Sequence, residues 1–186
     1  IKGLKKITIS DNSNCFACGS INSCGLQMQF YSHEQSVISW LSVPNHLCGW
    51  DNLIHGVVIS TILDEIMSWS AIYLLKKIIL TKSMTIDFMK PIYVGTKLKA
   101  VGMVSKQISE REALMEGFLY NEAEEICAKS RGTYVLFETK VAKKMVGLNF
   151  MIFLLSSLNL RGLGSGFRVQ RFWVLNSDIC HLRAAS

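Results

Sequence analysis

"HGVVISTILDEIMSWSAIYLLKK", residues 55–77, predicts one long helix that is covered on nearly all sides. Projected at about 100° per residue, its aliphatic side chains gather on one broad face, and a narrow stripe of hydroxyl and acidic side chains lies opposite. Apolar residues flank even this stripe, so the helix is expected at the centre of the fold. Asp51 or Asn52 is the expected N-cap.

The segments on either side of this helix alternate with the period of β-strands. They are residues 26–31 and 36–43 before it, and 81–90, 96–109, 112–121 and 126–138 after it. Short turns separate the last four segments, which predicts consecutive antiparallel strands. The order of elements predicts an α+β domain in which a curved antiparallel sheet wraps one long central helix.

The chain divides into three parts. Residues 1–25 form an N-terminal segment with a loop rich in Cys and Gly, residues 26–141 form the domain, and residues 142–186 form an extension without clear strand alternation. The apolar, uncharged run at residues 145–160 is shorter than the roughly 20 residues that span a bilayer, so no membrane span is expected. The first residues have no signal-peptide core, which leaves the cytoplasm as the expected location.

The composition is that of a folded protein and is compatible with a small anionic ligand. Apolar residues make up 49% of the chain and charged residues 18%, as in globular proteins. The net charge is +6, but the lysines are scattered and form no dense basic block with aromatic residues. Nucleic acid is therefore not expected as a partner, whereas a phosphorylated cofactor fits this modest basicity.

Three cysteines lie close together in "CFACGSINSC", residues 15–24. Cys15 and Cys18 form a CxxC pair, a spacing that occurs in zinc sites. No second CxxC or histidine pair follows at finger-like spacing, although His46 and Cys48 are near enough in sequence to supply ligands. We therefore expect a reduced, turn-forming loop and no metal.

Two adjacent acids, Asp64 and Glu65, interrupt the apolar helix. An unpaired carboxylate is costly to bury and takes a partner or a raised pKa. One interpretation is that both acids face water or pair with Lys76, Lys77 or Lys82. The other is that Asp64 has a chemical role or a distant partner, because the positions three and four residues away hold no base.

The start of the helix carries a second candidate group, His55-Gly56. The N–H groups of Gly56 and Val57 would be unpaired donors at the positive end of the helix dipole, where they stabilise an oxyanion. His55 is either a proton-transfer group or a structural cap. Gly56 and Asp64 lie about 12 Å apart on a helix that rises roughly 1.5 Å per residue. One carbonyl reaches both only if Asp64 comes from a second chain, so a catalytic role predicts a dimer.

Together, "CFACGSINSCGLQMQF", "HGVVISTILDEIMSW" and "TIDFMKPIYVG" resemble the hotdog-fold acyl-CoA thioesterases of the PaaI type. The pattern of that family is His-Gly-Gly, an acid nine residues after the histidine, and a strand that ends in a Pro-Val-like turn. The resemblance covers residues 14–139. It implies the hotdog fold, acyl-CoA as substrate, no cofactor, and homodimers or dimers of dimers with active sites across the dimer interface.

The resemblance also implies roles for single residues. The catalytic acid falls on Asp64, the oxyanion-hole glycine on Gly56 and the motif histidine on His55, and a Ser/Thr that positions water falls near Thr81. Val57 replaces the second glycine of the motif, at the acyl entrance.

Three further positions concern substrate binding. Gly49 stands where some members have an asparagine, with Asn52 close by. Lys90, with Lys97 and Lys99, is expected to meet the phosphates of the coenzyme. The predicted function is hydrolysis of acyl-CoA to free acid and coenzyme A, with Asp64 as general base or nucleophile. The alternative is a non-catalytic hotdog module that binds acyl-CoA or another acyl ligand.

Overall fold

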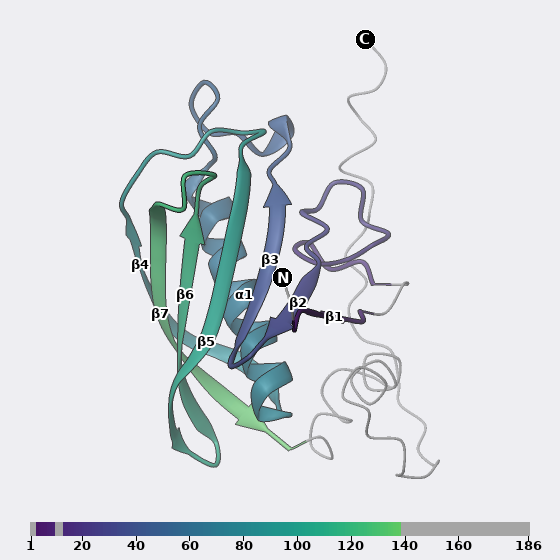
Figure 1. The fold of residues 1–186 in the computed structure, drawn as a ribbon, viewed down its shortest axis with the longest axis vertical. Coiled ribbons are helices and arrows are strands. Elements are labelled where there is room, and N and C mark those ends of the chain that lie inside the picture. Colours follow the sequence, from purple (N-terminus) through teal and green to yellow (C-terminus); the bar gives the residue numbers. More distant parts are fainter. Residues whose placement is uncertain (1–2, 10–12, 139–186) are drawn as a thin grey trace.

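The computed structural model describes residues 3–9 and 13–138 of the chain. In this part a seven-stranded antiparallel sheet curves around one long helix, α1 (Gly56–Leu75), as Figure 1 shows. The predicted α+β class and hotdog arrangement are confirmed. The predicted extension, residues 142–186, and its apolar run lie outside the described residues.

The strands before α1 form one side of the sheet and the strand after it forms the opposite edge. The elements are β1 (Lys5–Ile7), β2 (Phe30–His33), β3 (Ser36–Ser42), the 3₁₀ turn η1 (Asn45–Leu47), α1, β4 (Ile78–Phe88), β5 (Lys97–Ser109), β6 (Glu112–Tyr120) and β7 (Ile126–Phe137). The sheet order is β1-β2-β3-β5-β6-β7-β4. The chain therefore crosses one face of the sheet along α1, and β4 is an edge strand of the described sheet.

The N-terminal strands differ most from the prediction. Strand β1 was not expected, because three residues are too short for a periodic signal. The strand expected at residues 26–31 begins only at Phe30. Before it, the N–H groups of Leu26 and Met28 donate to carbonyls of the cysteine loop, at 3.0 and 2.9 Å, and Gln27 has a φ of 47°. The other five predicted strands are confirmed, with ends shifted by three residues at most.

Helix α1 lies against the sheet at very short range. Its side chains Ile62, Leu63 and Ile66 are fully buried. A Cβ atom built on Gly102 of β5 would lie 2.6 Å from the Ile66 carbonyl oxygen and 2.4 Å from Ser70 Oγ, so only glycine fits there. Among the described residues α1 is the one helix long and apolar enough to span a bilayer, and its burial in the core explains that composition.

Candidate active site

The first turn of α1 is capped by His55. Its Nδ1 accepts a hydrogen bond from the Val57 N–H at 3.1 Å, and its backbone is extended. The N-cap predicted at Asp51 or Asn52 is therefore wrong: Asp51 has a φ of 49° and belongs to the preceding turn. The Val57 N–H is likewise not the unpaired donor that was expected, because the imidazole accepts from it.

One backbone donor remains at this end of the helix. The N–H groups of Val58 and Ile59 both donate to the His55 carbonyl, at 2.9 and 3.2 Å. The Gly56 N–H has no hydrogen-bond acceptor within residues 3–9 and 13–138. It is thus a free donor at the positive end of the helix dipole, suited to a developing oxyanion.

Asp64 lies about two turns further along α1 and binds two hydroxyl groups. Its Oδ1 accepts from Thr81 Oγ1 of β4 and from the Tyr134 hydroxyl of β7, both at 2.8 Å. The β4–β7 ladder shifts its register between Thr81 and Ser83, and such irregularities often adjoin active sites. Both donors use Oδ1, and in the described part of the chain Oδ2 accepts no hydrogen bond. Oδ2 is the oxygen left for a water molecule or a substrate.

The interpretation that Asp64 pairs with a nearby lysine is wrong. Lys77 binds Glu138 at 2.8 Å and Lys82 binds Glu112 at 2.7 Å. The third candidate, Lys76, lies over the Tyr73 ring, 4.0 Å from its centroid. Neutral hydroxyl groups therefore orient the Asp64 carboxylate.

Tyr134 is the site residue that the sequence did not reveal. It lies 70 positions from Asp64 in an alternating strand, where the pattern predicts only burial. Burial, with the negative charge of Asp64, raises the pKa of its hydroxyl, so the phenol stays protonated and donates to the carboxylate. The one available signal was the residue type, since a buried tyrosine hydroxyl needs a hydrogen-bond partner.

The parent protein is expected to lose stability at alkaline pH because of Tyr134. We expect the Tyr134→Phe variant to lack this loss. An unfolded tyrosine ionises near pH 10, whereas the folded state retains the proton, so the parent protein loses about 1 kcal/mol by about pH 10.5. Urea unfolding at about pH 8 and pH 10.5 measures this difference. Tyr93→Phe, at an exposed ring, is the control and should match the parent. An equal loss of stability in Tyr134→Phe would contradict the prediction.

Glu65 faces away from this site. The Trp69 indole N–H donates to its Oε1 at 3.0 Å, and burial raises the pKa of Glu65 to about 7. The two adjacent acids therefore belong to different sites.

The other predicted site residues lie apart from Asp64. The Val57 side chain is 64% exposed beside the helix start. The backbone carbonyl oxygen of Asn52 accepts a hydrogen bond from the Val94 N–H at 2.8 Å. Lys90 pairs with Glu125 at 2.6 Å. Contacts of these residues with a substrate stay predictions.

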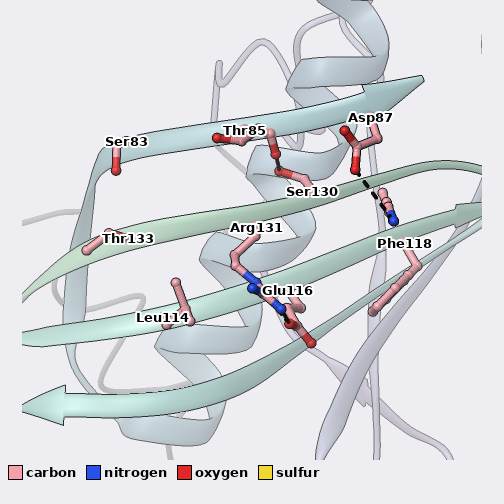
Figure 2. Close-up of a pocket in the computed structure, with 10 residues that line it drawn as sticks. Ser83, Thr85, Asp87, Leu114, Glu116, Phe118, Ser130, Arg131 and Thr133 are labelled. Carbon is pink, nitrogen blue, oxygen red and sulfur yellow. Dashed lines mark hydrogen bonds and ion pairs between the residues drawn. The ribbon is translucent and has the colours of Figure 1, made fainter. Parts of the chain in front are cut away.

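A pocket of about 630 Å³ lies on the face of β4, β6 and β7 that points away from α1 (Figure 2). Asp87 and Lys129 form an ion pair there at 3.5 Å, and Glu116 and Arg131 form another at 2.6 Å. None of the predicted site residues lines this pocket. The sheet separates it from Asp64, so we do not assign it to the candidate active site.

Comparisons with known proteins agree with the fold. Residues 51–126 match the family model of the thioesterase superfamily. No curated protein sequence matches the chain significantly. Among solved structures, the E. coli PaaI protein of the phenylacetic acid degradation operon is similar, with a TM-score of 0.56 and 19% identity over 61% of this chain and 81% of PaaI.

Two similar structures hold a coenzyme. A hypothetical thioesterase from Streptococcus pneumoniae with coenzyme A has a TM-score of 0.52 and 20% identity, over 55% of this chain and 81% of that protein. A Streptococcus mutans protein bound to acetyl-CoA has a TM-score of 0.55 and 20% identity, over 59% of this chain and 88% of that protein. The chain therefore has the hotdog fold of these structures, and its residues 51–126 are similar to the thioesterase superfamily.

Proposed function

We propose that this protein hydrolyses acyl-CoA thioesters to a free acid and coenzyme A. The observation that carries the proposal is Asp64, held by Thr81 and Tyr134 with Oδ2 free, on the same helix as the free N–H of Gly56. The thioesterase family match and the two coenzyme-bound neighbours support the substrate class.

In the proposed reaction the Gly56 N–H donates to the thioester carbonyl oxygen and stabilises the negative charge that develops there. Asp64 Oδ2 takes a proton from water, whose oxygen attacks the carbonyl carbon. The tetrahedral intermediate then expels the coenzyme A thiolate, which takes up the proton that Asp64 removed from water. In the nucleophilic variant, Oδ2 attacks the carbonyl carbon, the C–S bond breaks with release of the coenzyme A thiolate, and water then hydrolyses the resulting acyl anhydride to the free acid and Asp64.

The site requires two chains in this proposal. Gly56 and Asp64 lie on one helix, about 12 Å apart, so each would serve a site with the other residue from a partner. The edge strand β4 and the helix start expose apolar side chains that suit such an interface. They are Val57, Leu80, Phe88 and Met89. We therefore propose a homodimer, alone or as half of a tetramer.

The remaining residues have supporting roles in the proposal. His55 is a positioning residue, because its Nδ1 caps the helix turn that presents the Gly56 N–H. Val57 lies at the acyl entrance. Asn52 and Lys90 lie toward the coenzyme. Lys90 would break its ion pair with Glu125 and bind a phosphate of the coenzyme instead.

The test is turnover measured together with binding. Full-length protein is incubated with short, medium, long and aromatic acyl-CoAs, and the released coenzyme A is separated by chromatography, which avoids interference from the protein's own thiols. Calorimetric titration measures binding in parallel. We expect turnover with at least one class. Binding without turnover would instead identify the non-catalytic module, for which Val57 in place of the second motif glycine is the supporting feature.

A further inference from the structure

The CxxC segment forms a tight, preorganised turn. The Gly19 N–H donates to the Cys15 carbonyl at 3.0 Å, and the Cys15 N–H donates to Ser13 Oγ at 3.3 Å. A Cβ atom on Gly19 would lie 2.4 Å from the Cys15 backbone nitrogen, so the turn requires glycine at this position. The geometry of the two cysteines is therefore fixed by the backbone.

The turn is also tied to the domain. The Phe16 and Ala17 carbonyls accept from the N–H groups of Leu26 and Met28, just before β2. Cys18 is buried and Cys15 is partly buried, and both are free thiols. The sulfur atoms consequently face the protein interior.

A third ligand comes from α1. The sulfur atoms of Cys15 and Cys18 and a carboxylate oxygen of Glu65 all lie within 4.8 Å of one another. The Trp69 indole donates to Glu65 Oε1 at 3.0 Å and orients this carboxylate, as outer hydrogen bonds do for metal ligands. The sequence predicted no metal because no second cysteine or histidine pair follows the CxxC pair, whereas the third group here is a distant glutamate.

We propose that Cys15, Cys18 and Glu65 bind one Zn²⁺ ion, with a water molecule in the fourth position. Zinc binds sulfur at about 2.3 Å and carboxylate oxygen at about 2.0–2.2 Å, which places tetrahedral ligand atoms roughly 3.5–3.8 Å apart. The cluster needs to contract by little more than about 1 Å to reach that geometry. Two thiolates favour zinc over magnesium or calcium.

The ion would join the N-terminal loop to the central helix. Glu65 adjoins Asp64 but points away from Thr81 and Tyr134, so the metal takes no part in the proposed hydrolysis. Its effect is on stability, since a ligand that binds only the folded state stabilises it. This proposal therefore stands or falls independently of the thioesterase activity.

Metal titration of the full-length protein tests the site. The protein is stripped with a chelator under reducing conditions and titrated with Zn²⁺ against a chromophoric chelator, or with Co²⁺ as a spectroscopic probe. We expect one ion per chain and a thiolate-to-cobalt charge-transfer band. Cys15→Ser with Cys18→Ser should abolish both, and Glu65→Gln should lower the affinity at least about tenfold.

Cys48→Ser is the matched control, because Cys48 is exposed and lies outside the cluster. It should bind zinc like the parent, and zinc should raise the melting temperature of both. No binding by the reduced parent, or a Glu65→Gln variant that binds as tightly as the parent, would overturn the site. If the double variant fails to fold, the cobalt spectrum of the parent and the Glu65→Gln affinity still decide.

Discussion

Asp64→Asn is expected to lower the kcat of acyl-CoA hydrolysis by about 10²–10⁴-fold, the usual contribution of a general base. The amide has nearly the shape of the carboxylate, and its oxygen still accepts from Thr81 and Tyr134, so the fold should persist. Substrate affinity should change much less than turnover, because the lost proton acceptor acts in the transition state. Steady-state kinetics and calorimetry on the same preparation separate the two effects.

Glu116→Gln is the control for this substitution. Glu116 lies on the outer face of β6, paired with Arg131 at 2.6 Å and separated from Asp64 by the sheet. The variant undergoes the same change of carboxylate to amide and should retain parental turnover. If Asp64→Asn also keeps parental turnover, the assigned role of Asp64 is wrong even where the protein is an active thioesterase.

Mixing two inactive variants should restore activity, because each proposed site takes Gly56 from one chain and Asp64 from the other. The first variant is Asp64→Asn and the second is Gly56→Pro. In a mixed dimer, one site has both intact residues and the other has neither. Random exchange of chains should therefore recover about a quarter of the parental activity. Mixtures are assayed after subunit exchange, with the dimer content measured by light scattering.

Gly56→Pro is suited to this test because it deletes one N–H group and little else. Proline is well tolerated at the first position of a helix. His55, which precedes it, already has the extended backbone that a following proline requires, with φ −62° and ψ 137°. Loss of one oxyanion donor is expected to reduce kcat by about 10²–10³-fold.

Gly56→Ala is the matched control, since it keeps the N–H. Its Cβ would meet the Phe88 ring at an ordinary 3.7 Å. It should retain far more activity than Gly56→Pro. Equal losses of activity in Gly56→Pro and Gly56→Ala would mean that the absence of a side chain at Gly56 matters and that its N–H group does not. No recovery after exchange into mixed dimers would overturn the proposed site shared by two chains.

The elements of this fold are visible in the sequence because burial imposes a period on them. The apolar run at residues 55–77 and the alternating segments after it became α1 and β4 to β7 with small changes at their ends. The helix start was harder to predict. Asp51 and Asn52 are preferred capping types, but the chain makes one more turn before His55 caps the helix with its imidazole.

The candidate site was only partly predictable, since its contacts cross the fold. Sequence spacing singled out Asp64, and resemblance to a family singled out Thr81, which indeed binds Asp64. Tyr134 and the approach of Glu65 to the cysteine turn depend on how distant segments pack. A periodic pattern indicates which face of a helix or strand is buried. It does not indicate which side chains of other elements contact that face.

Gly102 shows how packing against the sheet positions a residue of the candidate site. A methyl group at this position would collide with the Ile66 carbonyl. The glycine therefore determines how closely α1 packs on β5. Asp64 lies only two residues before Ile66 on that rigid helix. The distance between Asp64 and the sheet, and with it the width of the proposed cleft between two chains, therefore depends on a glycine that lies outside the candidate site.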